Sequence, residues 1–261
     1  MTIPPFEPHI REGLLYGRGS CDTKAGGVAM IHAMKRIKES GEKPPCTIQF
    51  AGAVDEEYLF RGALDLAANL KAEAVVVAEP TDLSVIRAHK GVARFRIHIE
   101  GIAAHSSKPY LGVNAIVKMA QLITDIEREV LPTFQEKDHP LTGGPTLNIG
   151  VISGGAQVNF VPDSCTIEID RRVIPGEIAE QTLSIFEKIL SHAKTKDPDL
   201  KVKLEDPFLL DGAMETPEDS RIVQVASDAS QTVIGNSTIT GVPYGTDASK
   251  FTGVGIPAIA V

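Results

Sequence analysis

Three groups of carboxylates stand out among the residues that could do chemistry: Asp22, Asp55-Glu56-Glu57 and Glu79. Each lies beside a stretch that has the pattern of a helix or a strand. In a sheet of parallel strands the carboxyl ends meet at one edge, so these side chains can converge there. Converged carboxylates repel one another unless a cation or protons lie between them. The three groups together therefore predict a metal site.

Each group by itself has an ordinary alternative. Asp22 lies in a glycine-rich turn just before a predicted helix, where Asp commonly serves as an N-cap. Glu56 and Glu57 could be solvated loop charges, and Glu79 could be a loop acid before Pro80. The metal interpretation depends on all three groups occurring together.

The elements that would position these groups alternate between helix and strand. Apolar residues recur with a helical period from Ala25 to Lys38. The apolar runs 46–54 and 74–78 have the length of buried strands, and a second helix is predicted at 62–70. This alternation predicts an α/β domain with a mixed, largely parallel sheet.

The pattern changes at about Gly91. Residues 92–101 alternate between polar and apolar side chains, which is typical of a half-buried strand. Elements of the order β-α-β-β-α-β are predicted at 92–101, 113–130, 146–152, 165–174, 177–194 and 201–204. That order is the form of a ferredoxin-like α+β domain. We therefore predict a domain inserted at residues 91–206.

The residues on either side of the insert would form the other domain, from 1–90 and 207–261. A helix is predicted near 217–233 and a strand at 256–261, which restores the α/β pattern. The last strand is still apolar and extended where the sequence stops, whereas binding loops in such domains follow the carboxyl ends of strands. We therefore expect this outer domain to be incomplete.

Composition argues against several classes of partner. The 34 Asp and Glu residues outnumber the 26 Lys and Arg residues, and no dense basic run occurs, so we expect neither nucleic acid nor a membrane as partner. The apolar runs fall far short of the ~20 residues of a membrane helix. Three cysteines without a Cys-x-x-Cys pair favour a reduced, cytoplasmic setting.

The strings around the carboxylates resemble those of the zinc aminoacylase and carboxypeptidase family, which includes acetylornithine deacetylase and succinyl-diaminopimelate desuccinylase. These strings are Gly17-Arg18-Gly19-Ser20-Cys21-Asp22-Thr23-Lys24, Asp55-Glu56-Glu57 and Glu79-Pro80-Thr81. The resemblance runs along the whole chain, and its other strings begin at Ala104, Gly112, Asn159, Asp170 and Gly245. It implies a metallohydrolase domain and an inserted dimerisation, or lid, domain.

The resemblance also implies a two-metal centre. Asp22 would bridge two divalent ions, most often zinc, with cobalt or manganese as substitutes. Glu57 would bind one ion and Glu79 the other. Glu56 would be the general base and acid, which takes a proton from water and passes it to the leaving amine. Two such ions can lower the pKa of bound water and hold the scissile carbonyl.

Other residues would face the substrate. By resemblance, His105 reaches into the active site of a partner subunit and stabilises an oxyanion. Asn159, Arg172 and Thr246 would bind substrate, with Arg172 suited to an α-carboxylate. Arg171 is the alternative to Arg172, and the spacing alone would allow all of these to be ordinary polar residues of the surface.

The sequence departs from the family pattern at two metal ligands. The family has a His-x-Asp segment before the glycine-rich turn, and a second His after the last strand. Neither has a counterpart here, since His9 matches the region after the first segment and Met1–Pro8 resembles the interior of a family member. We therefore expect a chain that is cut short at both ends. Tyr58, Phe60 and Arg61 stand where smaller residues are usual in the family. This departure bears on the shape of the substrate pocket and not on the family.

The leading interpretation is a metal-dependent hydrolase that deacylates an N-acyl amino acid, as in arginine biosynthesis, and that forms a homodimer through 91–206. A dipeptidase or carboxypeptidase would use the same metals and base. An inactive dimerising or binding module is an alternative from another class. A phosphate-binding loop at Gly17-x-Gly19 is a weaker one, because the turn lacks the remaining residues of nucleotide motifs.

Overall fold

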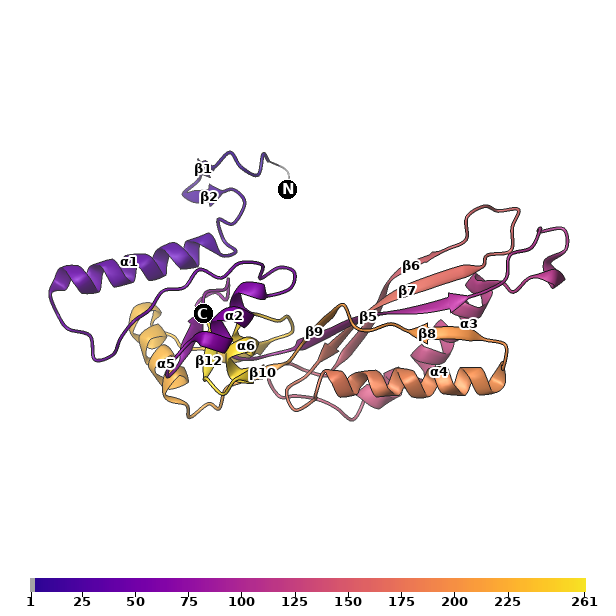
Figure 1. Ribbon diagram of the computed structural model, residues 1–261. Coiled ribbons are helices and arrows are strands. Elements are labelled where there is room, and N and C mark those ends of the chain that lie inside the picture. The colour runs from indigo at the N-terminus through magenta and orange to yellow at the C-terminus, as the bar shows by residue number, and fades with distance from the viewer. Residues whose placement is uncertain (1–2) are drawn as a thin grey trace. The chain divides into compact units, whose positions relative to one another are not determined.

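The computed structural model describes residues 3–261 and divides into two compact units (Figure 1). Unit 1 contains residues 3–87, 216–240 and 246–261, and unit 2 contains 88–215 and 241–245. The expected insert, 91–206, lies wholly within unit 2. Of the segment Met1–Pro8, the first two residues lie outside the described part of the chain.

Unit 2 has the predicted ferredoxin-like order. Its elements are β5 (Gly91–Glu100), α3 (Ala115–Val130), β6 (Thr146–Gly154), β7 (Ser164–Val173), α4 (Ser184–Lys196) and β8 (Lys201–Leu204). The four strands form an antiparallel sheet in the order β6-β7-β5-β8, and β9 (Leu209–Asp211) also pairs with β5. Short 3-10 helices occur at Pro109–Leu111, Leu131–Phe134 and Glu180–Leu183. The fold class expected for the insert is confirmed.

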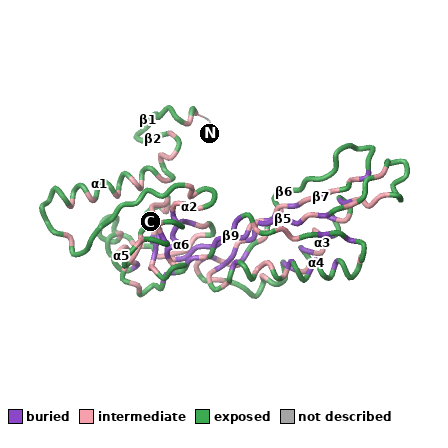
Figure 2. Tube along the Cα trace, in the orientation of Figure 1, coloured by how far each residue is buried: buried purple, intermediate pink, exposed green. Residues whose placement is uncertain are grey.

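The core of unit 2 follows from the alternation in β5. Phe95, Ile97 and Ile99 are fully buried and pack with apolar residues of α3 and α4, whereas Arg94, Arg96 and His98 between them are half-buried. Buried residues along β5 are coloured purple in Figure 2. The Phe95 ring meets the Phe186 ring of α4 edge to face, with centroids 4.8 Å apart. Asn114 begins α3 as its N-cap and accepts a hydrogen bond from the Val117 amide at 3.0 Å.

The outer face of the same sheet carries charged cross-strand pairs. Arg94 donates to Asp170 and Arg96 donates to Glu168, each from Nε at 2.8 Å. These residues lie directly opposite one another on β5 and β7. One face of the sheet is therefore apolar and the other is ionic, as a period of two requires.

The other sheet, formed mainly by strands of unit 1, is mixed, as predicted. Strand β3 (Val75–Val77) runs parallel to β12 (Ala258–Ala260), and β4 (Val85–His89) runs antiparallel to β12. Strands β10 (Met214–Glu215) and β11 (Ile239–Val242) also pair with β4. Parallel pairing of β3 with β12 and antiparallel pairing of β4 with β10 and β12 together make the sheet mixed.

Four helices belong to unit 1: α1 (Lys24–Ser40), α2 (Arg61–Asn69), α5 (Arg221–Ile234) and α6 (Ala248–Gly253). A small hairpin, β1 (His9–Arg11) with β2 (Leu14–Tyr16), precedes them. Helix α1 ends at Gly41, whose φ of 74° is left-handed and suits glycine. Val223 of α5 packs in a small core with Val85 and Ile259.

The predicted strand at 46–54 is wrong as an assignment. The segment is extended, but no other segment of residues 3–261 forms a ladder with it. Its apolar side chains are also partly exposed, with Ile48 at 43%, Phe50 at 41% and Val54 at 68%. An apolar run becomes a strand only where a neighbour accepts its backbone hydrogen bonds. The sequence pattern also failed to predict β4, β9, β10, β11 and α6.

Candidate functional site

Five carboxylates of unit 1 influence one another electrostatically, and we call them the carboxylate cluster: Asp22, Glu56, Glu57, Glu79 and Asp247. Each lies at the end of an element. Asp22 precedes α1, Glu79 follows β3, and the adjacent pair lies in the turn before α2. Asp247 lies at the N-cap position of α6. The first three groups are thus near enough for their charges to act on one another, and their convergence on a metal stays a prediction.

A close packing contact brings two members together. A Cβ added to Gly26, in the first turn of α1, would lie 2.6 Å from the Cβ of Ala78. The start of α1 therefore lies directly against the end of β3, and this close approach is possible only because residue 26 is a glycine. Asp22 and Glu79 flank this contact in the sequence, and the charge of Asp22 acts on Glu79.

The turn that carries Glu56 is held by several contacts. Nε of Arg61 donates to Asp55 at 2.6 Å, and the carbonyl of Asp55 accepts from the Phe60 amide at 2.8 Å. The ring of Phe60 lies 3.3 Å below Nζ of Lys250 in α6. A Cβ at Gly62 would lie 2.4 Å from the Val54 nitrogen, so this position also requires glycine. Phe60 and Arg61, which we flagged as departures, thus stabilise the turn.

The cluster strongly perturbs two of its acids. Burial, then the charge of Glu56 and those of the other carboxylates, raise the pKa of Glu79 to about 8. Burial, then Asp247 and Glu57, raise the pKa of Glu56 to about 7, although Lys250 acts in the opposite direction. Burial is the larger cause for both acids, and the neighbouring carboxylates add an excess of negative charge to it.

That excess fits a bound cation, and oxygen donors suit divalent ions. Within residues 3–261, however, no three His, Cys, Asp or Glu side chains are arranged as a metal cage. The cluster therefore supplies the charge for a cation without a preformed coordination geometry. The assignment of Asp22, Glu57 and Glu79 as ligands stays a prediction.

Thr246 and its neighbours belong to unit 1 and are buried. Thr246 is fully buried, and its Oγ1 accepts from the amide of Ala248 at 3.2 Å, at the start of α6. Asp247 and Lys250 are each 7% exposed and act on Glu56. Neither was among the residues we predicted for the site, although Asp247 lies in the Gly245-Thr246-Asp247-Ala248 string that carries the resemblance.

In unit 2 the structure brings His105 and Asn159 together. His105 forms an antiparallel bridge with Phe160, and the amide of Ser106 donates to the carbonyl of Asn159 at 2.9 Å. Nδ1 of His105 accepts from the amide of Ser107 at 3.2 Å and lies 2.9 Å from its hydroxyl. A nitrogen that accepts from an amide carries no proton, so the neutral ring holds its hydrogen on Nε2. His105 can therefore donate a hydrogen bond from Nε2.

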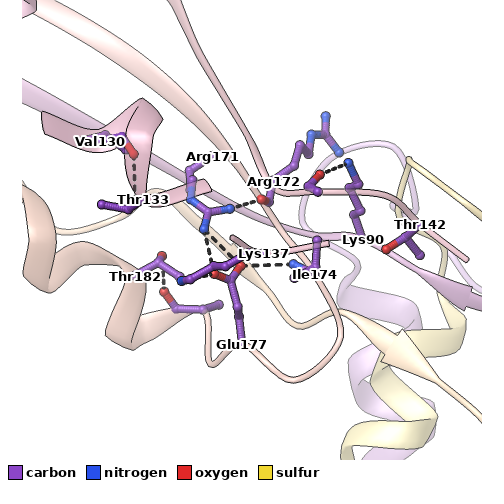
Figure 3. Close-up of polar contacts among 12 residues, drawn as sticks. Lys90, Val130, Thr133, Lys137, Thr142, Arg171, Arg172, Ile174, Glu177 and Thr182 are labelled. Carbon is purple, nitrogen blue, oxygen red and sulfur yellow. Dashed lines mark hydrogen bonds and ion pairs between the residues drawn. The ribbon is translucent and has the colours of Figure 1, made fainter. Parts of the chain in front are cut away.

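The two adjacent arginines of β7 have different environments (Figure 3). The side chain of Arg171 is 3% exposed, and Nη2 donates to both oxygens of Glu177 at 2.9 Å. Its guanidinium also lies 4.4 Å from the ring centre of Phe134. The side chain of Arg172 is 28% exposed and pairs with Asp170 at 2.8 Å. Because the guanidinium of Arg171 is buried between Glu177 and Phe134, Arg172 is the better candidate for a residue that binds substrate.

His105 and Arg172 lie at opposite ends of the sheet of unit 2. The loop of His105 follows the end of β5 at Glu100, whereas Arg172 lies opposite Val92 near its beginning. At about 3.3 Å per residue, these ends are about 25 Å apart. One copy of unit 2 therefore does not place both side chains around one small substrate.

Comparison with known proteins decides the family. A family model for the M20 peptidase dimerisation domain matches residues 87–198. The probable succinyl-diaminopimelate desuccinylase of Staphylococcus epidermidis is 30% identical over 97% of this chain and 67% of that protein. The chain belongs to the M20 family. The acetylornithine deacetylase of Myxococcus xanthus is also 30% identical, over 95% of this chain and 64% of that protein.

Solved M20 structures agree with the fold. Aminopeptidase PepT from Bacillus cereus superposes with a TM-score of 0.75 at 22% identity, over 98% of this chain and 67% of that one. This chain thus spans about two thirds of the M20 proteins that it matches. M20 proteins are hydrolases, and zinc dependence is characteristic of them. No helix within residues 3–261 has the length and apolar character needed to cross a membrane.

Proposed function

We propose that this M20 chain catalyses the metal-dependent hydrolysis of a linear amide. The proposed substrate is an N-acyl amino acid, and one product is the free amino acid. The observation that carries the proposal is the carboxylate cluster, whose two perturbed acids have pKa values of about 7 and about 8. Two relatives of the chain are named for the removal of succinyl or acetyl groups, which supports an acyl group as the part released.

Glu56 is the proposed general base and acid. A carboxylate whose pKa lies near neutrality can both accept a proton from water and return it to the departing amine nitrogen. The contacts of Asp55, Phe60 and Arg61 hold the turn that carries it. Asp22, Glu57 and Glu79 would hold two divalent ions, zinc in the first instance, and these ions would supply Lewis acidity and a water of lowered pKa.

Unit 2 would contribute the groups that bind substrate. Nε2–H of His105 is a donor for the oxyanion of the tetrahedral intermediate, Asn159 lies beside it, and Thr246 of unit 1 is a further candidate. Because about 25 Å separates His105 from Arg172 along the sheet, we propose that two copies of the chain form a homodimer, in which His105 serves the site of the partner. The family model for residues 87–198 supports this role of the unit.

The test uses the purified chain with added Zn²⁺ and a panel of N-acetylornithine, N-succinyl-diaminopimelate and simple dipeptides. We expect metal-dependent release of free amine from an N-acyl amino acid. Glu56→Gln should abolish release while zinc binding is retained, and Asp22→Asn should weaken zinc binding itself. Cleavage of dipeptides alone would favour the peptidase alternative.

The absence of both zinc binding and hydrolysis would contradict the proposal. It would leave the alternative of an inactive dimerising or binding module. Analytical ultracentrifugation of the chain would then show whether it forms a dimer.

We propose a cytoplasmic setting for the protein, since Cys21, Cys46 and Cys165 are all free thiols. Amino-acid metabolism, with arginine biosynthesis as one case, is the proposed setting.

A further inference from the structure

Two cationic side chains meet on the outer face of the sheet in unit 2. Arg172 lies opposite Val92 of β5, and Lys90 immediately precedes that strand. Because side chains alternate along a strand, residues 90, 92 and 172 belong to the same face. The close-up shows the end of the Lys90 side chain beside the guanidinium of Arg172 (Figure 3).

Lys90 is unusual in its burial. The residue is 5% exposed, and its ammonium donates one hydrogen bond, to the carbonyl of Gly144. An ammonium has three donors, so this contact occupies one of them. Burying a cation without a matching anion is unfavourable, and the structure pairs Lys90 with no carboxylate among residues 3–261.

The local charges do not balance either. Asp170 accepts from both Arg94 and Arg172, so one carboxylate serves two guanidinium groups. Burial, then the charges of Arg171 and Arg172, lower the pKa of Lys90, and Asp138 opposes them only in part. Arg171 has Glu177 as its own counterion. Asp211, opposite Val92 on β9, is a further carboxylate of this face, but the charges that act on Lys90 are those of Arg171, Arg172 and Asp138, so at Lys90 itself positive charge prevails.

We propose that Lys90 and Arg172 together bind the carboxylate of the substrate, with Lys90 as the second cation of the subsite. The bonds of Arg172 to Asp170 use Nε and Nη2, so the two hydrogens of Nη1 are not used in this ion pair. A carboxylate with two oxygens could accept from Nη1 and from Nζ at once. That this group is the α-carboxylate of an N-acyl amino acid rests on the proposed function.

A purely structural role for Lys90 makes a different prediction. If its bond to Gly144 only anchors the loop before β6, then loss of the ammonium should lower stability but leave anion binding unchanged. The two roles can therefore be separated by measuring ligand binding and unfolding on the same variants.

The experiment titrates N-acetyl-L-alanine into the ¹⁵N-labelled chain in EDTA at constant ionic strength, and follows the amide signals of residues 90, 144 and 172. N-acetyl-L-alaninamide, which lacks the carboxylate, is the control ligand. Lys90→Met and Arg172→Gln should each weaken binding of the acid roughly tenfold, the size expected for a hydrogen bond to a charged group. Lys90→Arg should retain much of it. Lys188→Met, on the exposed side of α4, is the matched control and should bind as the wild type does.

Equal binding of the acid and the amide would overturn the inference, as would wild-type affinity in Lys90→Met. If Lys90→Met does not fold, wild-type affinity in Arg172→Gln is decisive in the same direction, and that variant is expected to fold because the side chain of Arg172 is partly exposed. No metal is present in this titration. A chain that binds the carboxylate through Lys90 but hydrolyses nothing would contradict the proposed function alone, and the reverse result would contradict this inference alone.

Discussion

Arg171 donates from Nη2 to both carboxylate oxygens of Glu177, six residues further along the chain, at 2.9 Å each. Nη1 of Arg171 donates to the carbonyl of Arg172, and Lys137 donates to Glu177 at 2.7 Å. The carboxylate also accepts from the amide of Ile174 at 3.2 Å. This buried network fixes the turn after β7 and, with it, the backbone of Arg172 (Figure 3).

Substitution of the two neighbouring arginines should therefore have different consequences. Arg171→Met leaves Glu177 buried beside one lysine and should lower the free energy of unfolding by about 3–5 kcal/mol. Arg172→Met removes a partly exposed pair and should cost about 0–1 kcal/mol. Urea unfolding followed by circular dichroism measures both. Equal losses for the two variants would show that Arg171 has no special role in the fold.

The same network should set the acid limit of stability. Burial acts to raise the pKa of Glu177, but Lys137, Arg171 and the Ile174 amide outweigh it, so the pKa lies below the usual value of 4.5. The unfolded chain therefore binds this proton first as the pH falls. The contribution of Glu177 is full above pH 4.5 and is lost as the pH drops below it. Glu177→Gln should unfold more readily at pH 7 and show a weaker loss between pH 5 and pH 3, whereas an unchanged acid limb would contradict the assignment.

In the metal-free chain the carboxylate cluster should give stability a pH dependence opposite to that of Glu177. With a pKa of about 8, Glu79 binds its proton more tightly in the folded than in the unfolded state. Stability should thus decrease as the pH rises from about 4.5 to about 8. After allowance for solvent screening, Glu79→Gln should raise the melting temperature at pH 8 by about 2–4 °C. A melting temperature that responds to pH in the same way in both proteins would argue against the cluster as the cause.

Zinc binding should release protons from the same acids. At pH 7 Glu79 is largely protonated and Glu56 is close to half protonated, and a carboxylate must lose its proton to bind a metal. We expect release of about one proton per chain when Zn²⁺ is added at pH 7. Calorimetry in two buffers of different ionisation enthalpy measures this number, and Glu79→Gln should reduce it. Zinc binding with no proton release would place the ion elsewhere.

The sequence alone determined the elements whose patterns are local. The helical period at 25–38, the alternation in β5 and the order of elements in unit 2 all follow from which side chains must avoid water, and the structure confirms them. The strings around Asp22, Glu56 and Glu79 also identified the family, because chemistry restricts which residue types can serve there.

Only the tertiary structure decided features that depend on distant partners. The apolar run 46–54 is not a strand, since no ladder partner meets it within residues 3–261, whereas the short β4 is a strand because β10 and β12 pair with it. The choice between Arg171 and Arg172 likewise depended on Glu177 and Phe134, which bury one guanidinium and not the other. Whether an apolar run finds a ladder partner, and which of two adjacent arginines is enclosed, depends on how the chain packs, and the local patterns at 46–54 and 171–172 do not determine it.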